Sequence, residues 1–281
     1  MVFDYSEGLI VLDKPSGPTS HQSSAYLKEI LGIKKAGHSG TLDPNVSGVL
    51  PVAFGRSTRL LQFLLLAPKE YVCWMKLHGD VSRLELSQAF KKFKGEIKQR
   101  VPRKSAVKRQ TRKRTIYELE LLEMNGRNVL FRALVERGTY IRMLCIDIGK
   151  KLGVQAHMYE LRRTKVAHLD ESISFTLNEV KAAKIEYDAG KKLLLKRIVY
   201  PKEKIVEHLP KIVIYDDAVS SLLNGISLKA PGIKEMEDFD KDVFVKVFDE
   251  KNELIMIGKS TIKSKDVKKV GVVVLPEVVF N

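Results

Sequence analysis

The residues best suited to chemistry lie in one loop, residues 37–50, which reads GHSGTLDPNVSGVL. It holds one carboxylate, Asp43, among glycines at positions 37, 40 and 48, and Pro44 directly follows the acid. Glycine permits backbone angles and close approaches that a side chain would block, and proline fixes the chain beside the carboxylate. By itself the pattern fits either an acid aimed at a ligand or an ordinary Asp-Pro turn.

A second candidate is the basic run at residues 100–114, RVPRKSAVKRQTRKR, which contains eight Lys or Arg and no acidic residue. Such a run is either a solvated loop or a contact for a polyanion. The whole chain carries a formal net charge of +15, which indicates a nucleic acid or an anionic membrane surface as the partner. With the local and the global charge together, we favour nucleic-acid contact.

The remaining composition indicates a globular protein of 281 residues without a metal centre. The two cysteines, Cys73 and Cys145, lie in apolar segments, which favours reduced core thiols over a disulfide framework. The six histidines show no metal-ligand spacing. The longest apolar run, residues 60–67, is too short to span a bilayer, and no signal sequence opens the chain. We therefore expect a cytoplasmic protein without membrane contact.

These candidates must be positioned by the first 200 residues, in which strands and helices are mixed. The patterns predict a strand at 8–12, a helix capped by Thr19 and ended by Gly32, and a strand at 49–54. A helix at 57–67, a strand at 71–77 and a helix capped by Ser82 follow. Residues 116–122 and 129–135 read as a β-hairpin with a turn at Asn125-Gly126.

After the hairpin, residues 138–142 open a helix, and residues 156–164 predict a strand carrying two exposed cations, Arg162 and Arg163. Thr176 with Glu179 forms a capping box for the helical region that ends near residue 200. Beyond that point the chain has short β-rich segments, and residues 208–281 carry 11 Lys or Arg against 12 Asp or Glu. We predict two domains, 1–207 and 208–281, of which the second is a small β-barrel-like domain.

Several stretches together resemble the TruB-type pseudouridine synthases. The resemblance covers most of the first 200 residues and rests on KPSGPTS (14–20), GHSGTLDP (37–44), KEYV (69–72), GTYIR (138–142) and LRR (161–163). Residues 105–110 and 114–118 are similar to the archaeal and eukaryotic dyskerin-type branch, and without long Lys-rich tails the archaeal form is expected. The chain departs from this branch at residues 101–103 and at Lys113, where it is more basic.

The resemblance implies an α+β fold with a mixed, mainly antiparallel sheet flanked by helices, and a small C-terminal β-barrel-like PUA domain. It implies isomerisation of uridine in RNA to pseudouridine, with no cofactor. Asp43 matches the essential acid, Tyr71 the aromatic that stacks on the target base, and Arg142 the arginine that pairs with the acid. His38, Tyr140 and Leu161 match positions of the substrate pocket. Asp43 is expected either to attack C1′ or to take the 2′ proton and give a glycal.

The implied partners are a box H/ACA guide RNA, an rRNA or tRNA substrate and small accessory proteins. Alternatives are a guide-independent enzyme acting on the T-loop uridine of tRNA and a non-catalytic RNA-binding assembly protein. The residues expected to bind RNA are all cationic: Lys14, Arg103, Lys104, Lys108, Arg109, Arg112, Lys113 and Arg114.

Overall fold

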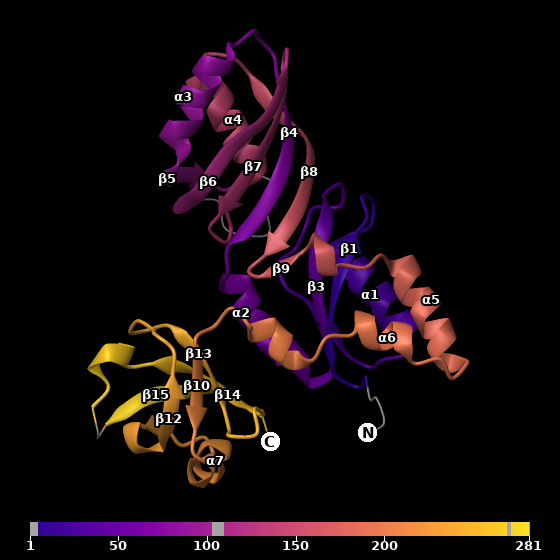
Figure 1. Cartoon of the computed structure of the whole chain (residues 1–281). Coiled ribbons are helices and arrows are strands. Elements are labelled where there is room, and N and C mark those ends of the chain that lie inside the picture. The colour runs from indigo at the N-terminus through magenta and orange to yellow at the C-terminus, as the bar shows by residue number, and fades with distance from the viewer. Residues whose placement is uncertain (1–4, 103–109, 269–270, 281) are drawn as a thin grey trace. The chain divides into compact units, whose positions relative to one another are not determined.

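The structure, a computed structural model, describes residues 5–102, 110–268 and 271–280. The chain divides into two compact units, Met1–Tyr200 and Pro201–Asn281 (Figure 1). Within the described residues no helix combines the length and the apolar character needed to cross a bilayer.

The first unit is built on one large sheet with the strand order β1-β3-β8-β4-β7-β6-β5, to which β2 adds beside β3 and β9 beside β8. Among the described strands, every pairing in it is antiparallel except that of β3 with β8. The mixed, mainly antiparallel α+β architecture predicted from the sequence is confirmed. Its strands are β1 Gly8–Lys14, β2 Ala36–His38, β3 Ser47–Phe54, β4 Lys69–Leu77, β5 Gly95–Arg100, β6 Thr111–Asn125, β7 Asn128–Val135, β8 Ala156–Val166 and β9 Leu169–Asp170.

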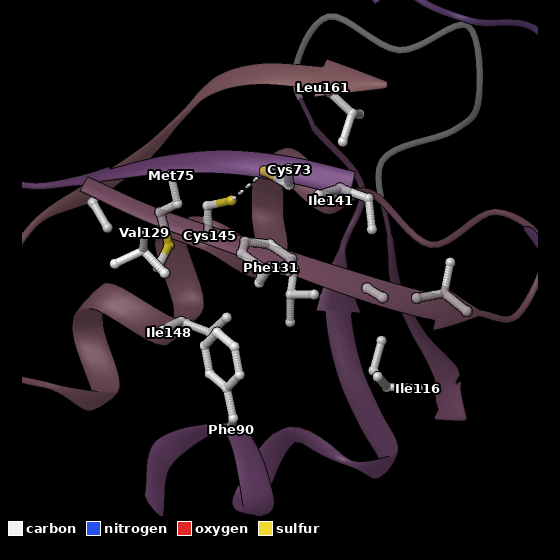
Figure 2. Close-up of a cluster of buried hydrophobic side chains, with 14 of the residues drawn as sticks. Cys73, Met75, Phe90, Ile116, Val129, Phe131, Ile141, Cys145, Ile148 and Leu161 are labelled. Carbon is white, nitrogen blue, oxygen red and sulfur yellow. Dashed lines mark hydrogen bonds between the residues drawn. The ribbon is translucent and has the colours of Figure 1, made fainter. Parts of the chain in front are cut away.

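Helices pack on this sheet in two groups, each with a hydrophobic core. α3 and α4 cover the β4–β7–β6 part, and their shared core includes Phe90, Phe131 and the cysteine pair (Figure 2). α1, α5 and α6 form the other core with β1 and β3. The helices of this unit are α1 Ser20–Leu31, α2 Leu61–Leu66, α3 Arg83–Phe93, α4 Ile141–Lys151, α5 Leu177–Asp188 and α6 Leu193–Ile198, with 3-10 turns at Gly55–Leu60 and Glu171–Ile173.

Local sequence signals explain where the helices begin and end. Thr19, Ser82 and Thr176 cap α1, α3 and α5, each in a reciprocal capping box, and Gly32 ends α1 with a left-handed φ of 66°. Two predictions were wrong in detail. The helix predicted at 57–67 is a 3-10 turn followed by the short α2. The hairpin turns at Gly126-Arg127 rather than Asn125-Gly126, because Asn125 still pairs with Asn128 and Gly126 supplies the positive φ.

The second unit is a small β-rich domain, as predicted. Its sheet has the order β11-β15-β14-β13-β10-β12, in which only β10 and β13 run parallel among the described strands. The elements are β10 Lys211–Ile214, α7 Asp216–Leu223, β11 Leu228–Lys229, β12 Ile233–Met236, β13 Phe244–Phe248, β14 Leu254–Ser260 and β15 Val272–Val279, with 3-10 turns at Lys202–Val206, Ala230–Gly232 and Ser264–Asp266.

Candidate active site

The loop that carries Asp43 joins β2 to β3 and is anchored by Ser20, which is distant from it in sequence. The Ser20 hydroxyl, at the start of α1, accepts a hydrogen bond from the Leu42 N–H (2.8 Å) and donates one to its carbonyl (3.1 Å). Leu42 and Val46 are buried on either side of Asp43, whose side chain remains 54% exposed. The local structure therefore fixes the backbone and turns the carboxylate outward.

Lys14 supports the same loop from the end of β1. Its fully buried ammonium donates to the carbonyls of Pro15 (2.7 Å), Pro18 (2.7 Å) and Pro44 (3.0 Å). Burial, followed by the nearby charge of Arg163, lowers the pKa of Lys14. The ammonium group is thus bound to three backbone carbonyls and is not available for the RNA contact predicted for Lys14.

Arg142, on helix α4, places a cation beside Asp43. It lies in the first turn of α4, and its guanidinium forms a hydrogen-bonded ion pair with the Asp43 carboxylate. The start of α4 is held by Gln99, which is buried and forms hydrogen bonds with the Tyr140 N–H (2.8 Å) and carbonyl (3.0 Å). An arginine beside a carboxylate favours the ionised form and fixes its direction.

Tyr71 lies on β4 between β7 and β8 and is half-buried against the core that contains Leu42 and Leu161. It is paired with Arg163 across β4 and β8, which places the two side chains next to each other on one face of the sheet. Part of the surface of the ring remains accessible. Leu161 is itself buried in that core (Figure 2).

Two further predicted pocket residues lie on elements that adjoin the site. Tyr140 is the residue before α4 and is half-buried. His38 ends β2, and its Nδ1 lies 3.4 Å from the Ser24 hydroxyl. Burial, and then the charges of His21 and Arg163, lower the pKa of His38, which favours a neutral imidazole.

The strand β8 corrects one prediction. Arg162 and Arg163 were expected to be exposed cations, but Arg163 is fully buried and Arg162 is half-buried in ion pairs with Asp13 and Glu171. Arg163 donates from Nε to the Val49 carbonyl (2.8 Å) and from Nη2 to the Gly40 carbonyl (2.9 Å). The sequence showed only two consecutive arginines. Because consecutive side chains of a strand lie on opposite faces, the two arginines meet different surroundings.

A third buried cation, Lys69, lies at the start of β4. Its ammonium donates to the carbonyls of Leu64 (2.9 Å), Leu65 (2.8 Å) and Ala67 (2.7 Å) at the end of α2. Burial, with the charges of Arg163 and Arg137, lowers the pKa of Lys69 to about 7. It thus ties a helix end to the strand that bears Tyr71, a role for which the sequence offered no signal beyond the KEYV motif.

The structure describes only some of the residues predicted to bind RNA. Arg103, Lys104, Lys108 and Arg109 lie outside the described residues. Arg112, Lys113 and Arg114 lie on β6; Lys113 pairs with Glu96 (2.9 Å) and Arg114 with Glu136 (3.7 Å).

The site thus combines one exposed, ion-paired carboxylate with a partly exposed aromatic ring. Among the described residues no cluster of three or more His, Cys, Asp or Glu could hold a metal ion. Such a site suits a reaction on a flipped base that needs one acid and a stacking surface.

Three family models cover the chain. The TruB family pseudouridylate synthase N-terminal domain matches residues 28–141, the tRNA pseudouridylate synthase B C-terminal domain matches 142–207, and the PUA domain matches 210–279. The chain therefore belongs to the TruB family of pseudouridylate synthases, and it carries a PUA domain.

Relatives agree with this assignment. A probable tRNA pseudouridine synthase B of Archaeoglobus fulgidus is 46% identical over 93% of this chain and 81% of the relative. That of Methanopyrus kandleri is 48% identical over 90% and 75%. Among solved structures, a Cbf5-Nop10-Gar1 complex matches with a TM-score of 0.93 and 46% identity, over 98% of this chain and 85% of that one. An H/ACA RNP bound to a substrate RNA containing 2'-deoxyuridine matches with a TM-score of 0.90 and 44% identity, over 98% and 85%. The family predicted from the sequence is confirmed.

Proposed function

We propose that this enzyme isomerises specific uridines of RNA to pseudouridine at the Asp43 site and receives its substrate through a box H/ACA guide RNA. The observation that carries the proposal is the pairing of Asp43 with Arg142, with Tyr71 packed on the core that contains Leu42, within a TruB-family fold. Asp43, Tyr71 and Arg142 are its proposed catalytic residues, and His38, Tyr140 and Leu161 line the proposed pocket.

The proposed chemistry needs one ionised carboxylate. Asp43 either attacks C1′ or removes the proton from C2′, and in both routes the bond from C1′ to N1 breaks. Arg142 orients the Asp43 carboxylate, and Tyr71 stacks on the extruded base. Glycosidases use a second carboxyl group to protonate their leaving group. Uracil leaves as a tolerable anion and is kept for reattachment through C5. The hydrogen on C5 is then lost as a proton and N1 is protonated, so no second carboxyl group is needed for the leaving group.

The two routes for Asp43 differ in which bond to hydrogen is broken. Substrate RNA deuterated at C2′ separates them, because only removal of the C2′ proton gives a primary isotope effect. A slowing of turnover by several-fold supports the glycal route, whereas a rate within about 20% supports attack at C1′.

Guide dependence is supported by the solved relatives, whose descriptions name Nop10, Gar1, an H/ACA RNP and a substrate RNA. The names of the curated relatives favour tRNA instead. We propose the boundary between the catalytic and PUA domains at residues 207 and 208; the family models end at 207 and begin at 210 around it. A cytoplasmic location is part of the proposal, supported by its RNA substrates.

The dependence of modification on the guide RNA distinguishes the two candidate substrates. Purified protein is incubated with tRNA alone, and with rRNA plus guide and accessory proteins, and pseudouridine is then mapped by sequencing. We expect modification of rRNA that depends on the guide. Modification of tRNA alone, unchanged by guide and partners, would support the tRNA enzyme instead.

The role of Asp43 is tested by Asp43→Asn, which removes the charge with little change in volume. Pseudouridine formation should fall by at least about 10⁴-fold while RNA affinity stays within about threefold. Normal turnover by this variant would refute the mechanism. Loss of RNA binding instead would support a purely RNA-binding role for the loop.

The proposed RNA contacts are tested by salt dependence. Replacing Lys108, Arg109 and Arg112 with Gln should weaken RNA binding and reduce the slope of log K against log salt by about 0.7–0.9 for each lost phosphate contact. Lys184, which pairs with Asp188 on α5 and lies outside the proposed RNA-binding set, is replaced in the same way as the comparison. An unchanged slope in the triple variant would indicate that the basic run at residues 100–114 is a solvated surface that does not contact RNA.

A further inference from the structure

We propose that Arg163 is a positioning residue of the active site, whose buried guanidinium fixes both ends of the Asp43 loop and the Tyr71 side chain in one arrangement. The inference deepens the proposed function and rests on it for its catalytic part. Its structural part rests on three contacts, two glycines and the burial of one cation.

The first two contacts close the Asp43 loop. Nη2 of Arg163 donates to the carbonyl of Gly40 (2.9 Å), and Nε donates to the carbonyl of Val49 (2.8 Å). Gly40 precedes Asp43 by three residues and Val49 follows it by six, so one planar group spans the segment that carries the acid. The guanidinium fork has a rigid geometry, so these bonds fix the distance between the two carbonyls.

The third contact reaches Tyr71. Arg163 and Tyr71 are paired residues of β8 and β4, so their side chains lie next to each other on one face of the sheet, and the interaction with Tyr71 opposes the lowering of the Arg163 pKa. The acid loop and the stacking aromatic belong to different elements of the sheet and are more than twenty residues apart in sequence. Arg163 is therefore a common reference point for the acid and the ring.

The glycines of the loop make room for this arrangement. A Cβ at Gly40 would lie 3.2 Å from Nη1 of Arg163, and one at Gly48 would lie 2.2 Å from the Arg163 carbonyl oxygen. Both glycines also have a positive φ, of 79° and 104°. The glycine pattern first noted around Asp43 is thus explained in part by the close approach of β8.

The burial of Arg163 makes its partners important. Burial lowers its pKa, and the interaction with Tyr71 opposes this shift. A fully buried guanidinium is tolerated only when its donors find acceptors. Here the acceptors are the backbone carbonyls of Val49 and Gly40, so removing the fork leaves polar groups of the active-site loop unsatisfied.

The test compares Arg163→Lys with Arg162→Lys in the full-length chain. Lysine keeps the charge but cannot bridge the carbonyls of Gly40 and Val49 at once. Arg162, the neighbouring arginine, binds Asp13 and Glu171 instead and controls for loss of a guanidinium from β8. Hydrogen exchange of peptides within residues 39–50 should accelerate at least about tenfold in Arg163→Lys and less than about threefold in Arg162→Lys. Equal exchange in the two variants would overturn the inference.

The catalytic part is read from steady-state kinetics with guide and substrate RNA. Arg163→Lys should lower kcat about 100-fold with KM for RNA within threefold, whereas Arg162→Lys should keep both within threefold. A normal kcat, or a loss confined to KM, would refute the positioning role. If the native chain forms no pseudouridine, the proposed function fails, and the exchange data still decide whether Arg163 holds the loop.

A second variant covers a failure of Arg163→Lys to fold. Gly40→Ala keeps the guanidinium but presses a Cβ against Nη1, while Gly95→Ala introduces the same residue at a similar φ of 100° into open space. Exchange of residues 39–50 should rise in the first and not in the second. The same rise in both would overturn the inference.

Discussion

Gly48→Ala offers a quantitative test of how closely β8 packs on the Asp43 loop. A Cβ at Gly48 would lie 2.2 Å from the Arg163 carbonyl oxygen and 2.9 Å from its N and C atoms. All three are backbone atoms, so the two strands must separate. Gly95→Ala is the matched control, because its φ of 100° resembles the 104° of Gly48 but its Cβ meets nothing within 4 Å.

The expected magnitude follows from what the separation breaks. Both variants carry the strain of a left-handed residue, about 1–3 kcal/mol, which cancels in the comparison. In Gly48→Ala the short pairing of β3 with β8 opens, and the Arg163 hydrogen bonds to Val49 and Gly40 are lost with it. Hydrogen bonds to charged groups contribute about 1.5–3 kcal/mol each. Gly48→Ala should therefore destabilise the protein by about 3–6 kcal/mol more than Gly95→Ala.

The assay is denaturant unfolding of both variants, with pseudouridine formation measured under conditions in which each remains folded. Gly95→Ala should keep its turnover within about threefold, and Gly48→Ala should lose at least about 100-fold. Equal free energies of unfolding for the two variants would refute the packing proposed here. Full turnover by a folded Gly48→Ala would show that the loop tolerates a displaced β8.

Two further predictions concern buried groups outside the reacting atoms. The pKa of Lys69 is lowered in the folded state to about 7, so the unfolded chain binds more protons between that pH and 10.5, and this group makes stability rise with pH across the window. Between pH 7 and 10, the free energy of unfolding of the native protein should rise by about 2–4 kcal/mol more than that of Lys69→Met, as measured by denaturant unfolding. Parallel pH profiles of the two proteins would contradict this. Cys73 and Cys145 are buried with their sulfurs 3.6 Å apart, and the hydrogen bond with Cys145, followed by burial, raises the pKa of the Cys73 thiol. Both thiols should react with a disulfide reagent at least about 10³-fold more slowly in the native protein than in denaturant, and rapid labelling of the native state would refute it.

The sequence was sufficient wherever a local pattern decides the outcome. The caps at Thr19, Ser82 and Thr176 and the stop at Gly32 were predicted because each signal acts within one turn of helix. The family motifs singled out Asp43 and Arg142, and the structure brings those two side chains together.

The failures share a different cause. Arg163 was predicted to be an exposed cation and Lys14 an RNA contact, whereas both side chains are buried, which is rare for charged residues. Their burial depends on carbonyls supplied by segments distant in the chain, among them Val49 for Arg163 and Pro44 for Lys14. No pattern within a strand or loop records where those carbonyls will lie, so the supports of the active site appear only in three dimensions.

The parallel pairing of β3 with β8 has a consequence for how the active site forms during synthesis. Val49 and Arg163 are separated by 114 positions in the chain, so their contact requires the closure of a long loop and is expected to form late in folding. A nascent chain that has emerged only as far as α4 already contains Asp43, Tyr71 and Arg142, but it lacks β8. Ribosome-bound fragments of this length therefore contain the proposed catalytic residues without Arg163, their proposed common support. We expect the site to be completed only after β8 has left the ribosome and joined the sheet.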